Sequence, residues 1–171
     1  MKNVILFGFK GCGKTHYGRL LASRLNYPFI DTDHLIESRC ADLTCREIVH
    51  KIGEAEFRIL EKKAIASLNI DQDTVISVGG GAVLDPDNVH ILKKMGTLIY
   101  LEESKEILKQ RIFNASYMPS YLDENDPLAS FEKMYRERKP LYEKIPSVRL
   151  NIEQKTEQEV LALLENMRSN G

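Results

Sequence analysis

Short apolar runs and segments with helical periodicity alternate along the chain. The apolar runs have the pattern of buried parallel strands, which carry apolar side chains on both faces. Because strand and helix alternate throughout, we expect right-handed βαβ units and an α/β fold whose parallel sheet is covered on both faces. The expected strands lie at residues 4–7, 29–30, 74–78, 97–101 and, more weakly, 148–150.

Helical periodicity fills most segments between these runs. Thr44 and Glu47 have the spacing of a capping box at one helix start, and Pro140 is expected to break another helix. The stretch 114–127 holds two prolines, several acids and no helical period, so it predicts a long loop. The expected helices lie at 17–25, 54–68, 104–113, 128–142 and 157–167, with others near 35–36, after Thr44 and after Pro86.

Length and composition narrow the class of protein. The 171 residues suit one domain, expected over 1–171, and the 43% hydrophobic share is ordinary for a soluble protein. A net charge of -1 gives no general attraction to nucleic acid or to an anionic membrane. The three cysteines lack a CxxC spacing, which argues for a reducing compartment. We therefore expect a cytoplasmic protein with neither a nucleic-acid nor a membrane partner. A monomer is a separate expectation that the composition does not decide.

The segment after the first expected strand carries the strongest motif. It reads GFKGCGKT from Gly8 to Thr15 and fits G-x-x-x-x-G-K-[ST] between a strand and a helix. Its glycines let backbone N–H groups face the phosphates of ATP, Lys14 would neutralise the transferred group, and the Thr15 hydroxyl would hold Mg²⁺. The ATP site expected here comprises Gly8, Gly11, Cys12, Gly13, Lys14, Thr15 and His16.

Two segments at the ends of other strands are candidates for the phosphoryl acceptor site. In an extended chain Asp31 and Asp33 point to the same side, so one carboxylate could serve Mg²⁺ and the other could take the acceptor's proton. A solvated turn or a helix cap at Asp33 explains these acids equally well. The glycines Gly79, Gly80 and Gly81 either admit a ligand close to the backbone or form a plain loop.

Two basic segments have alternative explanations of their own. Arg58 has Glu54 and Glu61 at helical spacing, so a surface salt-bridge cluster is one interpretation and an anion site is the other. Arg138, with Arg136 and Lys139 beside it, could equally form a solvated basic face.

Taken together, these segments resemble the shikimate kinase family. GFKGCGKT, FIDTD, GEAEFRILE, SVGGGAV and RERKPLY occur in the family's order and spacing over about residues 3–151. The resemblance implies a three-layer α/β/α sandwich of the P-loop kinase type, with a five-stranded parallel sheet and a mobile lid at about 114–127. It also implies transfer of the ATP γ-phosphoryl group to the 3-hydroxyl of shikimate, on the route to chorismate and aromatic amino acids.

The resemblance also implies roles for individual residues. Asp33, Arg58, Gly80 and Arg138 would bind shikimate, with Gly79 and Gly81 beside them and with Asp33 as the base. The arginines suit a carboxylate because a guanidinium binds it bidentately. On the nucleotide side, Thr15 and Asp31 would hold Mg²⁺, Arg111 would lie near the adenine, and Lys155 is a further candidate there.

The sequence departs from the family in the expected lid. Met118 stands where the family has an arginine, and no Lys or Arg occurs between Phe113 and Phe131. Losing one such cation typically costs on the order of 10²–10³ in rate. Three explanations stay open for the missing arginine. Lys10 could replace its charge, a hydroxyl of Tyr117 or Tyr121 could replace its contact, or the protein could be a slow or altered kinase.

Two other functions stay open at this point. One is a related metabolite kinase of the gluconate or nucleotide type. The other is a module that binds nucleotide or shikimate with reduced turnover.

Overall fold

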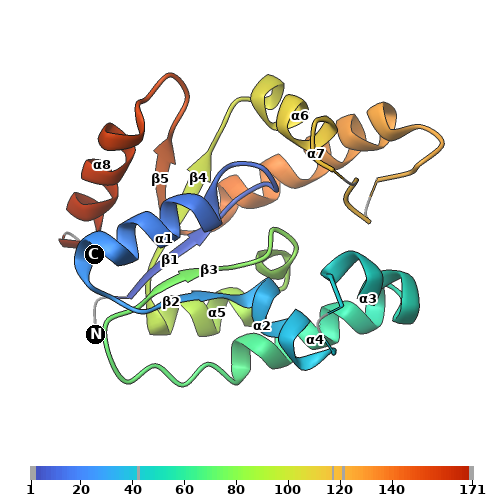
Figure 1. The fold of residues 1–171 in the computed structure, drawn as a ribbon. Helices are drawn as coiled ribbons and strands as arrows, with labels where there is room; N and C mark the ends of the chain where they lie inside the picture. Colours follow the sequence, from blue (N-terminus) through green and yellow to red (C-terminus); the bar gives the residue numbers. More distant parts are fainter. Residues whose placement is uncertain (1–2, 42, 117, 121, 170–171) are drawn as a thin grey trace.

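A computed structural model describes residues 3–41, 43–116, 118–120 and 122–169, and Figure 1 shows their arrangement. In chain order the elements are β1 (Asn3–Phe7), α1 (Lys14–Leu25), β2 (Phe29–Asp31), α2 (Thr32–Arg39), α3 (Cys45–Ile52), α4 (Glu54–Ala66), β3 (Val75–Ser77), the 3₁₀ turn η1 (Ala82–Leu84), α5 (Pro86–Met95), β4 (Gly96–Glu102), α6 (Lys105–Phe113), α7 (Pro127–Lys144), β5 (Val148–Asn151) and α8 (Glu157–Ser169).

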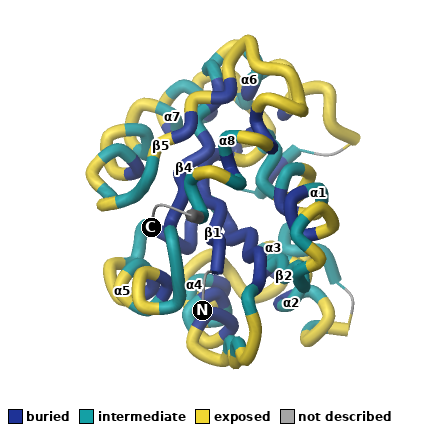
Figure 2. Tube along the Cα trace, turned by 90° about the vertical axis from the view of Figure 1, so that its left-hand side faces the viewer, coloured by how far each residue is buried: buried dark blue, intermediate teal, exposed yellow. Residues whose placement is uncertain are grey.

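The strands form the expected parallel sheet of five strands, in the order β2-β3-β1-β4-β5. The register at the centre places Leu6 of β1 beside Ser77 of β3 and Ile99 of β4. All of β1 is buried, as its continuous apolar run predicts, and Figure 2 shows the central strands as the buried part of the molecule. Helices α1 and α8 pack against each other on one side of the sheet, and α5 packs with α4 on the other.

A second, smaller apolar cluster lies outside the sheet. It joins α2, α3 and α4 through Ile36, Ile48, Phe57 and Ala64. Helix α3 begins with the predicted capping box, in which the Thr44 side chain and the Glu47 side chain each bind the other's backbone N–H. These three helices stand beside the carboxyl end of the sheet, opposite α6 and α7 (Figure 1).

The predicted break near Pro140 is wrong. Helix α7 runs without interruption from Pro127 to Lys144 with Pro140 inside it. A proline leaves the carbonyl four residues earlier without its helical donor. Pro140 is exposed, so water can satisfy that carbonyl, while Phe131 and Tyr142 anchor the buried side of the helix on both sides of the proline. In the described part of the chain, no helix combines the length and apolarity that crossing a membrane requires.

Candidate functional site

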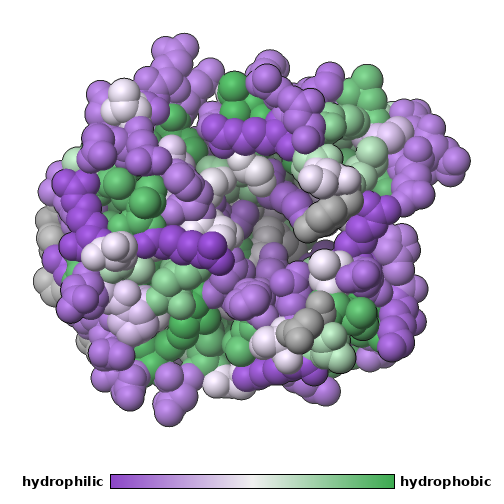
Figure 3. Space-filling view, in the orientation of Figure 1, coloured by the Kyte–Doolittle hydropathy of each residue, from purple (hydrophilic) through white to green (hydrophobic). Residues whose placement is uncertain are grey.

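A cavity of about 810 Å³ opens at the carboxyl ends of β1, β2 and β3. This volume lies in the usual range for small-ligand sites. Phe9, Asp31 and Gly79, which end or follow these three strands, line it together with residues of α2, α3, α4 and α7. Figure 3 shows the surface hollowed between the α2–α4 group and the α6–α7 group, with hydrophilic residues around the opening.

The glycine-rich loop forms the floor of the cavity. The Lys14 Nζ donates to the carbonyl oxygens of Gly8 and Phe9 at 3.0 and 2.9 Å, so the ammonium lies inside the loop. Gly8 has a φ of +149°, and a Cβ there would lie 2.6 Å from the Leu101 carbonyl oxygen, so only glycine fits. Cys12 is fully buried, in keeping with its interpretation as a small packing side chain.

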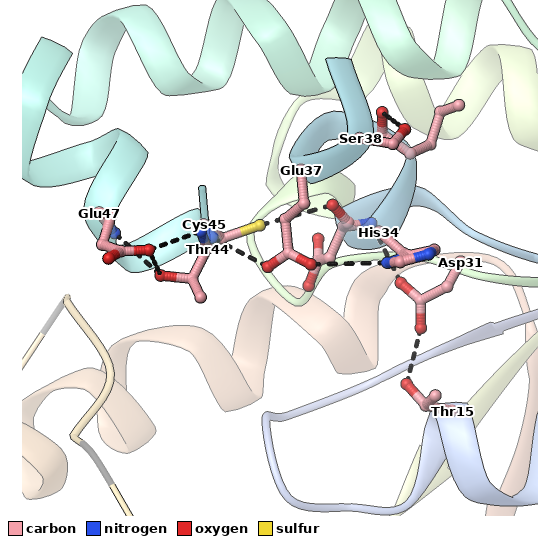
Figure 4. A network of polar contacts seen from close by, with 10 residues as sticks. Thr15, Asp31, His34, Glu37, Ser38, Thr44, Cys45 and Glu47 are labelled. Carbon is pink, nitrogen blue, oxygen red and sulfur yellow. Dashed lines mark hydrogen bonds and ion pairs between the residues drawn. The ribbon is translucent and has the colours of Figure 1, made fainter. Parts of the chain in front are cut away.

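Two side chains next to this loop have the donor chemistry of a Mg²⁺ site. The Thr15 hydroxyl donates to Asp31 Oδ2 at 2.7 Å (Figure 4). A hydroxyl and a carboxylate are the hard oxygen ligands that Mg²⁺ takes from a protein, which usually supplies one or two of them and leaves the rest to phosphate and water. The residues present therefore fit the ion.

The two aspartates do not form an extended pair, which corrects the geometry expected from their spacing. Asp31 ends β2 and caps α2 by accepting the Asp33 N–H at 3.0 Å, and Asp33 lies in the first turn of that helix. Both still line the cavity. The Thr32 hydroxyl between them accepts the Gly79 N–H at 3.2 Å, which ties this turn to the glycine segment.

The Asp33 carboxylate occupies space that a side chain at Gly79 would take. A Cβ on Gly79 would lie 2.5 Å from Asp33 Oδ1 and 2.9 Å from Glu61 Oε1. Burial raises the pKa of Asp33 to about 6, with help from the Asp31 and Glu61 carboxylates and against the ammonium groups of Lys14 and Lys10. A carboxyl with a pKa close to the working pH is suited to accept a proton.

The salt-bridge cluster around Arg58 does form, but it belongs to the cavity wall. Arg58 pairs with Glu54 at 2.9 Å and also with Glu61. Glu61 is only 4% exposed, and burial raises its pKa while the Arg58 and Arg138 guanidinium groups lower it. The Arg58 guanidinium lies so close to Gly81 that a Cβ there would stand 2.0 Å from Nη1. Glu61 therefore orients an arginine of the cavity wall; helical spacing predicted the pair but not its burial there.

Helix α7 contributes Arg138 and Tyr142 to the same wall. Arg138 lines the cavity and lies beside the Tyr142 hydroxyl, and its positive charge lowers the pKa of Glu61. The Tyr142 hydroxyl donates to the Gly80 carbonyl at 2.7 Å, and its ring is fully buried. The glycine segment is thus fixed from two sides, by Thr32 and by Tyr142, and neither role was expected from the sequence.

Two of the remaining nucleotide-side candidates, Arg111 and Lys155, line a second cavity of about 510 Å³. Arg111 lines both cavities, donates to the Gly11 carbonyl at 2.8 Å and pairs with Glu103 at 3.2 Å. Lys155 lines only the second cavity. His16 lines the first cavity, and a hydrogen bond of 2.7 Å between its Nε2 and Glu157 Oε2 joins α1 to the start of α8.

The expected lid reaches the cavity without a basic side chain in its described part. Met118, Pro119 and Ser120 line the cavity, whereas Tyr117 and Tyr121 lie outside the described residues. Arg46 of α3 donates to the Met118 carbonyl and pairs with Glu124. The guanidinium that meets the lid therefore comes from α3, and no motif in the sequence pointed to it.

Comparisons with known proteins identify the family of this chain. The family profile described as Shikimate kinase matches residues 10–168. A shikimate kinase of Caldanaerobacter subterraneus subsp. tengcongensis is 38% identical over 160 residues, which cover 94% of this chain and 92% of the relative. One from Hahella chejuensis is 41% identical over 155 residues, which cover 90% of this chain and 79% of the relative.

Among solved structures, a shikimate kinase from Acinetobacter baumannii in complex with shikimate matches with a TM-score of 0.86 and 31% identity. The match covers 98% of this chain and 93% of that one. Because the profile and the relatives each span most of the sequence, and the fold as a whole matches that of a solved shikimate kinase, the chain belongs to the shikimate kinase family.

Proposed function

We propose that this shikimate kinase moves the γ-phosphoryl group of ATP to the 3-hydroxyl of shikimate across the cavity described above. The observation that carries the proposal is the division of this cavity into two chemically distinct halves. Lys14, Thr15 and Asp31 line the half next to the glycine-rich loop, and Arg58 and Arg138 line the half next to α4 and α7. Asp33 lines the cavity too, and its carboxylate is close enough to Lys14 for the ammonium to lower its pKa.

The donor half would bind the phosphates of ATP. Backbone N–H groups of the loop and the N-terminus of α1 provide positive potential, and the Lys14 ammonium lies within the loop. Thr15 and Asp31 would hold Mg²⁺, which neutralises phosphate charge when bound. Arg111 and Lys155, on the walls of the second cavity, would lie along the rest of the nucleotide.

The acceptor half would bind shikimate by its carboxylate. Ion pairs with Glu54 and Glu61 hold Arg58 in place, so its guanidinium group is oriented before the substrate binds. Arg138 lines the same wall. The glycine segment, fixed by Thr32 and Tyr142, would let the ring approach the backbone closely.

Transfer would proceed in one in-line step. The 3-hydroxyl oxygen forms a bond to the γ-phosphorus while the bond from that phosphorus to the bridging oxygen of ADP breaks. Asp33 accepts the proton of the hydroxyl and returns it to solvent after the products leave. Lys14 stays close to the oxygens on which charge accumulates.

We also propose that residues 1–171 act as one domain and that the protein works as a cytoplasmic monomer.

A further proposal is that residues 114–127 close over the substrates as a lid. The contacts of Arg46 with the Met118 carbonyl and with Glu124 support the lid, since they join it to the acceptor-side helices. Slower hydrogen exchange in 114–127 on addition of ATP and shikimate is the expected result, and unchanged exchange would count against closure.

The proposed function is tested by an acceptor-selectivity assay. Purified protein with Mg²⁺ and ATP is expected to release ADP in proportion to added shikimate, and to release little with gluconate or with no acceptor. Equal release in all three reactions would contradict the assignment of shikimate as acceptor. Turnover with gluconate alone would favour the related metabolite kinase.

The raised pKa of Asp33 predicts how activity depends on pH. Below pH about 6 the carboxyl is protonated and cannot take the acceptor's proton, so kcat/KM for shikimate should fall about tenfold per pH unit. The measurement is a pH–rate profile between pH 5 and 8, with circular dichroism at each pH to show that the protein stays folded. A flat profile in a folded protein would show that Asp33 is not the base.

Gly81→Ala is expected to raise KM for shikimate and leave KM for ATP unchanged. The backbone of Gly81 has a φ of −77°, which alanine adopts freely, but its Cβ would displace the Arg58 guanidinium. Losing one charged hydrogen bond to the substrate costs about 1.5–3 kcal/mol, or about tenfold to a hundredfold in KM. Arg58→Gln is the matched comparison and should change KM in the same direction. An unchanged KM in both variants would place the carboxylate elsewhere.

A further inference from the structure

We propose that Lys10, at the tip of the glycine-rich loop, is a catalytic residue whose ammonium contacts the phosphoryl group during transfer. The proposal rests on the proposed function and adds a residue to it. It concerns a specific need of phosphoryl transfer, because negative charge spreads over the three outer oxygens of the moving group and has to be met by positioned cations. The described part of the lid supplies none.

Among the described residues, the six other lysines and arginines that line the cavity already have partners, and three of them pair with carboxylates. Arg58, Arg46 and Arg111 each pair with at least one glutamate, and Arg19 stacks over the Phe29 ring at 5.8 Å. Their carboxylate partners are Glu54 and Glu61 for Arg58, Glu124 for Arg46, and Glu103 for Arg111.

Two more cations remain besides Lys10. Arg138 interacts with the Tyr142 hydroxyl and with the charge of Glu61. Lys14 donates to two carbonyl oxygens of the loop. Lys10 lines the same cavity with an exposed side chain, and no hydrogen bond or ion pair of its ammonium is found within the described residues. Its charge is therefore available to a ligand.

The position of Lys10 is fixed between the donor and acceptor halves. The Cys12 N–H donates to the Phe9 carbonyl at 3.2 Å, which closes a turn with Lys10 inside it. Phe9 is buried and stacks on Tyr135 at 4.9 Å, so the turn is anchored. On the acceptor side, a Cβ at Gly80 would lie 4.0 Å from the Lys10 backbone nitrogen.

Lys10 lines the same cavity as Asp33, the proposed base. Its ammonium is near enough to Asp33 to favour the ionised carboxylate, although it forms no ion pair with it in the described residues. A lysine side chain is flexible and ends in an ammonium group with three N–H donors. The Lys10 ammonium could therefore reach an outer oxygen of the phosphoryl group as it passes to the acceptor. Such a contact would be stronger in the transition state than in the ground state, so it would act on kcat.

The test compares Lys10→Met, Lys10→Arg and the control Lys51→Met. Lys51 is an exposed lysine of α3 that does not line the cavity. We expect Lys10→Met to lower kcat by about 10²–10³ while both KM values change by less than about threefold. Lys10→Arg should recover most of the loss because it restores the charge, and Lys51→Met should behave like the wild type. An unchanged kcat in Lys10→Met would overturn the proposal.

Binding of a transition-state mimic separates catalysis from a structural role. The affinity for ADP, Mg²⁺ and aluminium fluoride, measured with and without shikimate, should fall in Lys10→Met by a factor close to the loss in kcat. The affinity for ADP and Mg²⁺ alone should change by less than about threefold. Equal losses in both would make Lys10 a ground-state contact and would overturn its catalytic role. If the wild type shows no shikimate-dependent turnover, the proposed function fails. The role of Lys10 is then decided without acceptor, by whether Lys10→Met loses more affinity for ADP, Mg²⁺ and aluminium fluoride than for ADP and Mg²⁺ alone.

Discussion

Asp33→Asn is expected to lower kcat by about 10²–10⁴ and, at the same time, to stabilise the protein without ligands at neutral pH. The loss of activity follows because an amide cannot take the proton of the acceptor hydroxyl. Asparagine keeps the shape of the side chain beside Gly79, so the acceptor half should stay intact and KM for shikimate should change far less than kcat.

The gain in stability follows from the direction of the Asp33 pKa. Its pKa is about 6 in the folded protein and lower in the unfolded chain, so the folded state holds this proton more tightly. Stability from this group is therefore full below pH about 4 and is lost as pH rises through about 6. Asparagine cannot ionise, so Asp33→Asn should have a higher Tm than the wild type at pH 7, with the difference vanishing near pH 4.

These two readouts are measured together on one purified variant. Steady-state kinetics at pH 7.5 give kcat and KM, and thermal melts at pH 4, 5.5 and 7 give the stability difference. A variant that loses activity and also melts lower at pH 7 would show that Asp33 is structural. A variant with near-normal kcat would show that another group takes the proton.

Lys14→Met is expected to lower kcat by about 10²–10³. The Lys14 ammonium lies within the loop, next to the carbonyl oxygens of Gly8 and Phe9, where the phosphates would bind. Methionine fills similar space without the charge, so the loop should keep its path. The loss should be larger in kcat than in ADP affinity, because charge grows on the transferred group as the bond to ADP breaks.

Kinetics and calorimetry with ADP and Mg²⁺ test this expectation, with Lys51→Met as the control for removing a lysine charge. Parallel losses in kcat and in ADP affinity would show that Lys14 binds the nucleotide without a special role in transfer. A variant with wild-type kcat would contradict the assignment of the loop as the donor site.

The sheet could be predicted from sequence because its strands are buried on both faces. β1 and β4 contain continuous apolar runs, and each expected strand appears in the structure within one or two residues. The glycine-rich loop was equally recognisable, because the approach of backbone N–H groups to phosphate requires glycine at fixed spacing. The start of α3 after Thr44 could be predicted from the spacing of its capping box.

The parts that escaped prediction depend on contacts between distant segments. From its position in the sequence, Glu61 cannot be told apart from an exposed glutamate on a helix surface. Only the packing of α4 buries it beside the glycine segment. Tyr142 reaches the Gly80 carbonyl across 62 positions of sequence, and Arg46 reaches Met118 across 72. The extended geometry expected for Asp31 and Asp33 was wrong because α2 starts directly at the end of β2, and only the alternative of a helix cap near Asp33 allowed for this.

The most direct test of the central claim is to identify the product. Protein, Mg²⁺, ATP and shikimate are incubated, and the phosphorus NMR spectrum and the ADP released are measured on the same sample. The proposed function predicts a single phosphate ester on the 3-hydroxyl of shikimate, in a one-to-one ratio with ADP. Inorganic phosphate in place of an ester, or an ester at another hydroxyl, would contradict it.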